Sequence, residues 1–350
     1  MYRNHRPPRS SESVPLTLFY RHPSSYEHDT GAHPENATRI KAISDAVDGA
    51  ALPGLVETEA PRATSEQLNR VHDPSHVVTL AAFCADGGGM IDGDTVVSEG
   101  SWEAALRASG AACDAVERML GGEDRAAFCA LRPPGHHAER DRAMGFCLTN
   151  HVAAAAEHAR TLGVERVLIF DWDVHHGNGT EEIFKASSDV LYASVHQAPL
   201  FPGTGDISYS GEGRGDGYTV NLPVPAGSGD ALFEALVERV IMPLGRSFEP
   251  GLVAISAGFD AHNADPLASC LMSEAGYRAM AARMAGLAAE LDAPLLVCLE
   301  GGYETGALGR SVIATLEGLE DDPENVGHAD ASLAEPYLER LETPLLTEGA

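Results

Sequence analysis

The sequence predicts an α/β fold in which a mostly parallel central sheet is flanked by helices. Short apolar runs alternate with longer segments of helical spacing, which is the pattern of repeated strand–helix units. Several apolar runs also lead directly into clusters of glycine and polar residues, and such sheets gather their functional groups at the carboxyl ends of the strands. The chain has 350 residues, 44% of them hydrophobic, which is enough to bury one large core, and we see no internal repeat.

Six short apolar runs bounded by turn-forming residues are expected to be strands: Ala126–Leu131, Arg166–Phe170, Val190–Val195, Tyr218–Leu222, Leu252–Ser256 and Leu295–Leu299. Four longer segments have helical spacing: Trp102–Leu120, Val152–Leu162, Ala231–Phe248 and Glu274–Leu291. We expect Ser101 to cap the first of these helices, Gly121 to end it, and Ser273 to cap the last. The tail beyond Glu320 is acidic and broken by prolines, so we expect it to pack loosely on the edge of the domain.

Charge and composition argue against several classes of partner. The net charge is −28, which repels phosphate backbones, so we expect no nucleic acid partner. We find no apolar run long enough to cross a membrane. Residues 1–15 are polar and rich in arginine and proline, which predicts a flexible leader on a cytoplasmic protein, with one domain over 16–350. None of the six cysteines forms a C-x-x-C pair, which favours reduced, packed thiols.

A metal site is predicted after the strand that ends at Phe170. Residues that alternate along an extended segment point the same way, so Asp171, Asp173 and His175 share one direction. Carboxylate and imidazole ligands suit zinc, and also iron or cobalt. An exposed, charged strand end explains this short pattern equally well, and a metal would need a further ligand from elsewhere. Asp260 is the candidate because it follows its own apolar run, although it could also be a simple turn residue.

Two further clusters carry acid–base and hydrogen-bonding groups. His136 and His137 follow a stiff Pro-Pro-Gly segment, and a histidine can act as a general base near neutral pH. Asp171 and Asn178 are available to fix their tautomers. Tyr303 follows two glycines, and its hydroxyl could donate to a developing oxyanion, although a packed aromatic is the more common role for a lone tyrosine.

Taken together, these segments resemble the histone deacetylase superfamily, and most closely its class II and bacterial members, which include the acetylpolyamine amidohydrolases. The similarity runs from about His33 to Tyr303. It rests on HPENATR, SWEAALRASG, RPPGHHA, GFCLTN, DWDVHHGNGT, SVHQAPLFPGTG, SAGFDAH, DPL and LEGGY, in family order. Any one of these stretches could occur by chance, but their joint presence is specific.

The resemblance implies an arginase/deacetylase-like fold with a catalytic domain over 16–350. It implies one catalytic zinc ion held by Asp173, His175 and Asp260. His136 and His137 become a catalytic pair, with Asp171 behind the first and Asn178 behind the second. Tyr303 becomes the oxyanion donor. The side chains expected to line a substrate tunnel are those of Phe146, Phe201 and Leu267, with Gly145 leaving room between the two phenylalanines.

The resemblance also implies one or two structural potassium ions. By position, the first would be held by Asp171, Asp173, His175, Ser194 and Val195, partly through backbone oxygens. The second would involve Phe184, Ser187, Val190 and Tyr218. The chain departs from the family pattern at Ala37, His76 and His151, which affects loop shape more than the chemical centre.

The expected reaction is hydrolysis of an N-acyl amide, with acetyl-lysine in proteins or peptides as the first substrate class. An acetylpolyamine or another small acylated amine is the alternative on the same site. A ureohydrolase with two manganese ions fits less well, because His262 stands two residues after Asp260 where a second acid is needed. A binding module that has lost catalysis is the remaining rival, but no expected ligand is missing. The sequence leaves the oligomeric state open, and a homo-oligomer is compatible with it.

Overall fold

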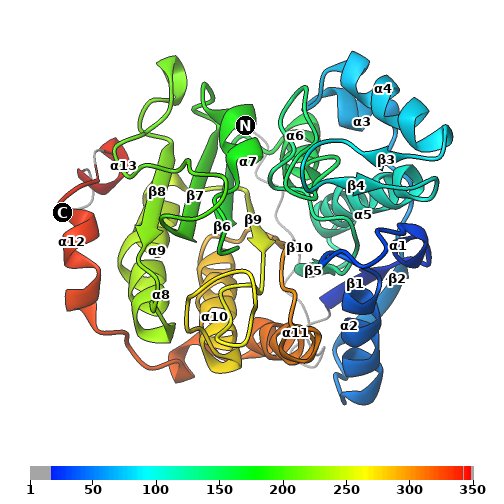
Figure 1. The fold of residues 1–350 in the computed structure, drawn as a ribbon. Coiled ribbons are helices and arrows are strands. Elements are labelled where there is room, and N and C mark those ends of the chain that lie inside the picture. Colours follow the sequence, from blue (N-terminus) through cyan, green and yellow to red (C-terminus); the bar gives the residue numbers. More distant parts are fainter. Residues whose placement is uncertain (1–16, 342, 348–350) are drawn as a thin grey trace.

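The computed structural model describes residues 17–341 and 343–347, so the expected leader, residues 1–15, lies outside the described residues. Its centre is an eight-stranded sheet in the order β2-β1-β5-β10-β9-β6-β7-β8, with every neighbouring pair parallel (Figure 1). The strands are β1 (Thr17–Arg21), β2 (Leu55–Glu59), β5 (Ala126–Cys129), β6 (Val167–Asp171), β7 (Val190–Gln197), β8 (Thr219–Val224), β9 (Leu252–Ala257) and β10 (Leu295–Leu299). The predicted α/β class is confirmed.

All six predicted strands are present, with bounds that differ by up to two residues. The two strands of the main sheet that the sequence analysis did not predict, β1 and β2, lie at one edge of it. β2 is partly exposed along its whole length, so its sequence has no continuous apolar run. A small antiparallel hairpin of β3 (Gly89–Met90) and β4 (Val96–Val97) stands apart from the main sheet.

Helices cover both faces of the sheet: α1 (Ser24–Glu27), α2 (Thr38–Gly49), α3 (Ser65–Asn69), α4 (Pro74–Ala85), α5 (Ser101–Leu120), α6 (His151–Thr161), α7 (Asn178–Phe184), α8 (Asp230–Leu236), α9 (Met242–Phe248), α10 (Glu274–Glu290), α11 (Thr305–Glu320), α12 (Glu335–Leu338) and α13 (Pro344–Thr347). The helix predicted over 231–248 is divided into α8, a π-helical turn and α9. Pro243, which has no amide N–H to donate, is the second residue of α9.

Two of the three predicted helix ends are confirmed. Ser273 caps α10 by accepting from the Gly276 amide, and Gly121 is the C-cap of α5. The prediction for Ser101 is wrong, because Ser101 is itself the first residue of α5. Its buried hydroxyl instead accepts from the Ser98 amide and hydrogen-bonds His28.

Alternation along the strands divides the core into two layers. In β6, Leu168 and Phe170 pack with α2 and α8–α11, whereas Val167 and Ile169 face the layer formed with α5 and α6. Because both faces of the sheet are covered, the central strands read as continuous apolar runs.

The C-terminal tail packs more closely than expected. Tyr337 and Leu338 lie against the core, and the Tyr337 hydroxyl donates to the Pro223 carbonyl. Thr343 is buried, and its hydroxyl donates to the Gly217 carbonyl. The acidic composition of the tail hid these apolar anchors. Within the described residues, no helix has both the length and the apolar character required to cross a membrane.

Candidate active site and metal centre

The predicted metal, catalytic and tunnel residues lie at the ends of five strands that are adjacent in the sheet, or in the connections after them: β5, β10, β9, β6 and β7. His136, His137 and Phe146 lie in the connection after β5, and Tyr303 follows β10. Asp260 follows β9. In a parallel sheet the carboxyl ends of adjacent strands lie at the same edge, so segments far apart in sequence meet there. The convergence expected from the sequence is therefore present.

Asp173, His175 and Asp260 form a compact cluster in which one donor atom from each residue lies within 4.8 Å of the others. The Nδ1 atom of His175 is 3.1 Å from Asp173 Oδ1 and 3.0 Å from Asp260 Oδ2. The other oxygen of each carboxylate is held by the backbone. Gly301 N–H donates to Asp173 Oδ2, and Val174 N–H donates to Asp260 Oδ1.

The charges of this cluster fit a bound cation. Both carboxylates are buried, and burial together with the charge of Asp173 raises the pKa of Asp260 to about 7. Burial disfavours a charged His175, yet hydrogen bonds to Asp173 and Asp260 raise its pKa to about 10. The carboxylates of Asp173 and Asp260 have oxygens within 4.8 Å of each other. Two negative charges this close require a positive charge between them, which either a proton or a metal ion can provide. Zinc accepts carboxylate oxygen and imidazole nitrogen as ligands, and catalytic zinc sites have three protein ligands.

His136 and His137 lie beside this cluster, with ring centroids 4.0 Å apart and ring planes tilted by 42°. His136 Nδ1 lies 3.0 Å from Asp171 Oδ2, and His137 Nδ1 lies 2.8 Å from Asn178 Oδ1. Although burial opposes a charge on His136, the carboxylates of Asp171 and Asp173 raise its pKa well above the ordinary value. Burial and the neighbouring imidazoles lower the pKa of His137. His136 therefore favours its protonated, charged form, and His137 favours its neutral form.

Tyr303 is held in place by two charged side chains, those of Asp265 and Arg39. Asp265 Oδ2 accepts from the Tyr303 amide at 2.6 Å, and its Oδ1 accepts from the Leu267 amide. The guanidinium of Arg39 lies 5.0 Å from the centre of the Tyr303 ring and donates to the carbonyls of Gly302 and Glu300.

Arg39 belongs to the HPENATR segment, but the sequence analysis gave it no function. The signal was its spacing, because Arg39, Ile43 and Val47 share the buried stripe of α2. Glu300 was also given no role, although its carboxylate accepts from the amides of Gly135 and His136 and so holds the histidine segment.

Phe201 lies beside the histidine pair, and Phe146 lies beside Tyr303. The Phe201 ring is edge-on to His137 at 5.2 Å, and the Phe146 ring is edge-on to Tyr303 at 5.8 Å. A Cβ atom at Gly145 would lie 2.5 Å from a His137 ring carbon, so the space that Gly145 leaves is occupied by His137. Leu267 is partly exposed and is linked to Tyr303 through Asp265.

The two sets of residues expected to bind potassium lie at different ends of β7. Asp171 and Ser194 are register partners on β6 and β7, with Val195 next along the strand and with Asp173 and His175 just beyond β6. The second set surrounds the amino end of β7, with Ser187 N–H donating to the Phe184 carbonyl and Tyr192 N–H to the Tyr218 carbonyl; Val190 is the first residue of that strand.

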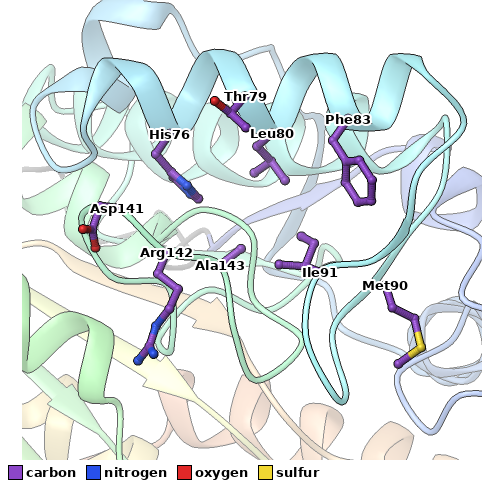
Figure 2. Close-up of a pocket in the computed structure, with 9 residues that line it drawn as sticks. All are labelled: His76, Thr79, Leu80, Phe83, Met90, Ile91, Asp141, Arg142 and Ala143. Atoms are coloured by element: carbon purple, nitrogen blue, oxygen red, sulfur yellow. The ribbon is translucent and has the colours of Figure 1, made fainter.

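A surface cavity of about 380 Å³ lies between α4 and the segment that leads to Gly145 (Figure 2). It contains none of the predicted site residues. Its lining is apolar apart from a few polar groups: His76, Thr79, Leu80, Phe83, Met90, Ile91, Asp141, Arg142 and Ala143. In Figure 2 the Arg142 side chain extends away from α4. The departure at His76 thus changes the wall of this cavity and not the metal cluster.

Comparison with known proteins identifies the family. Residues 33–319 match the model of the histone deacetylase domain. A probable deacetylase of Methanothermobacter thermautotrophicus is 41% identical over 86% of this chain and 90% of its own length. A histone deacetylase-like amidohydrolase of Pseudomonas aeruginosa is 39% identical over 88% and 81%. The crystal structure of the HDA15 HD domain matches with a TM-score of 0.84 and 34% identity, over 93% of this chain and 95% of that one. The chain therefore belongs to the histone deacetylase family.

Proposed function

We propose that this chain is a zinc-dependent deacylase that hydrolyses N-acetyl amides, with acetyl-lysine in proteins or peptides as the first substrate class. The observation that carries the proposal is the meeting of three elements at one sheet edge. These are a three-residue metal cluster, a histidine pair with opposite protonation preferences, and a tyrosine held by Asp265. Family membership supports hydrolysis of an acylated substrate, and the names of the relatives agree with it.

Asp173, His175 and Asp260 would hold the zinc ion. When bound, zinc supplies a Lewis acid that polarises an acyl carbonyl and lowers the pKa of water. The binuclear alternative lacks support, because the residue two after Asp260 is His262, whose ring faces Glu274 at 3.4 Å. We therefore expect each chain to bind one metal ion at this cluster.

His137 is assigned as the general base. Its Nδ1 is occupied by Asn178, which leaves Nε2 to take a proton from attacking water, and burial keeps the ring neutral. His136 is assigned to charge stabilisation and to proton return to the departing amine, since Asp171 favours its protonated form.

Tyr303 is assigned as the donor to the tetrahedral oxyanion. Burial raises the pKa of its phenol well above the ordinary value, so it keeps the proton that it donates. Phe146 and Phe201 provide apolar walls for the stem of an acyl-lysine, and Leu267 offers no charge to a distant ammonium group. This favours acyl-lysine over an acetylated polyamine, which remains the alternative substrate.

The potassium sites are proposed on family resemblance, with geometry as limited support. Asp171 and Ser194 face each other across β6 and β7, and the backbone around Phe184 and Tyr218 is folded close to β7.

All six cysteines are buried and free, which is compatible with a reducing compartment, and we propose the cytoplasm.

A substrate panel tests the proposal. The zinc-loaded protein should release acetate from an acetyl-lysine peptide, and its kcat/KM for this peptide should exceed its kcat/KM for acetylspermidine. Longer acyl-lysines and trifluoroacetyl-lysine are measured as additional substrates. His137→Ala should lower kcat by on the order of a hundredfold or more. The matched control is His328→Ala, because the His328 side chain is 96% exposed. No hydrolysis of any acylated amine by the zinc-loaded protein would refute the proposed function.

A further inference from the structure

A third residue stands behind the pair formed by His137 and Asn178. The amide nitrogen of Asn178 donates to Glu139 Oε1 at 2.8 Å, so the three side chains form a chain of hydrogen bonds. Asn178 is buried and the Glu139 side chain is 20% exposed. The backbone of Glu139 is also fixed, since its amide donates to the Arg142 carbonyl and its carbonyl contacts His72 Nδ1.

This arrangement decides which way the Asn178 amide points. An asparagine side chain has one accepting end and one donating end, and either end could face a histidine nitrogen. A carboxylate only accepts, so Glu139 attracts the NH₂ end. The sulfur of Met144, a weak acceptor, lies 3.4 Å from the same nitrogen. Both neighbours of the nitrogen are acceptors, and the carbonyl oxygen must therefore face His137.

The orientation of the amide in turn selects the tautomer of His137. A carbonyl oxygen at 2.8 Å from Nδ1 requires the proton on Nδ1. The lone pair then lies on Nε2, the nitrogen available for base catalysis. In His136 the carboxylate of Asp171 holds the proton on Nδ1 directly. The neutral amide separates His137 from a negative charge, so this ring is oriented without being driven to its charged form.

We propose that Glu139 is a positioning residue that fixes the tautomer of His137 through the orientation of the Asn178 amide. The inference rests on the proposed function, in which His137 is the base. Arg142 pairs with the same Glu139 oxygen at 3.0 Å, and its side chain is 58% exposed on the cavity wall (Figure 2). The orientation of Asn178 is therefore linked to a group at the protein surface.

Four variants of the zinc-loaded enzyme test this arrangement. Glu139→Ala removes the acceptor and should lower kcat by about tenfold with KM within about twofold. Glu139→Gln retains an acceptor oxygen and should recover most of that loss. Asn178→Asp places two carboxylates in contact and should lower kcat, whereas the double change Glu139→Gln with Asn178→Asp rebuilds a donor–acceptor pair and should restore it. Glu165→Ala, at an exposed glutamate, is the control.

The deciding measurement does not depend on turnover. Nitrogen chemical shifts of ¹⁵N-labelled histidine report the tautomer, and the His137 signals are assigned by their loss in His137→Ala. We expect a protonated Nδ1 in the unmodified enzyme and in the double variant, and a mixture or the reversed tautomer in Glu139→Ala. An unchanged tautomer in Glu139→Ala overturns the inference, whether or not kcat falls. Failure of the unmodified enzyme to hydrolyse any acylated amine overturns the proposed function and leaves the tautomer measurement readable.

Discussion

Asp265 holds the backbone at Tyr303, so replacing Asp265 should displace Tyr303. Asp265 is buried, and its carboxylate accepts from three backbone amides: Tyr303 at 2.6 Å, Glu304 at 3.3 Å and Leu267 at 3.0 Å. Asp265→Ala removes all three acceptors at once. The Tyr303 segment follows two glycines and has no other described acceptor for these amides, so we expect it to move.

The magnitude follows from the bond that holds Tyr303. A hydrogen bond to a charged acceptor contributes about 1.5–3 kcal/mol. If that restraint acts on the transition state, its loss lowers kcat by roughly 10- to 150-fold. Asp265→Asn should cost less, because its one carbonyl oxygen can stay with Tyr303 and leave only the Leu267 amide unpaired.

The assay is kcat and KM on an acetyl-lysine peptide, measured together with metal content and melting temperature. We expect KM and the metal content, near one per chain, to change little. The informative comparison is with Tyr303→Phe, which removes the hydroxyl itself. In that background Asp265→Ala should have little further effect, because it would misplace a group that is already absent. Full additivity of the two losses, or an equal loss of metal in Asp265→Ala, would show that Asp265 does not act through Tyr303.

Three other predictions concern the metal, the tunnel rim and acid stability. Asp260→Ala should abolish turnover and reduce the bound zinc, because three protein ligands are the minimum of such a site; full metal occupancy in this variant would remove Asp260 from the ligand set. Leu267→Glu should shift the kcat/KM ratio toward acetylspermidine by roughly tenfold, as expected for one new charge contact, and an unchanged ratio would contradict the assignment of Leu267 to the rim. Burial lowers the pKa of His151 to about 4, below about 6.5 in an unfolded chain, so its neutral form stabilises the fold above pH ~6.5. This contribution, about 3 kcal/mol, should be lost as the pH falls from 6.5 toward 4. The free energy of unfolding of His151→Asn, measured with urea, should therefore depend less on pH over that range than that of the unmodified protein. An unchanged pH dependence would contradict this role of His151.

The sequence by itself determined the fold class and the segments that carry the chemistry. Strands buried on both faces, such as β6 and β9, read as uninterrupted apolar runs, and polar clusters mark the points where they end. The edge strand β2 gave no such signal, because it is partly exposed along its length. The acidic tail gave a misleading signal, because a few residues within it, among them Tyr337, Leu338 and Thr343, anchor it to the rest of the domain.

Local residue patterns left open which polar groups meet, and the tertiary structure decided it. Alternation predicted one shared direction for Asp171, Asp173 and His175, yet Asp171 contacts His136. Asp173 and Asp260 both contact His175. Periodicity describes neighbours along one element and contains no information on contacts across the sheet. Asp260 reaches His175 because β9 is the register partner of β6. Glu139 reaches Asn178 because the connection after β5 folds over the start of α7. Such contacts depend on strand order and loop path, which are set by packing of the whole core and not by local sequence.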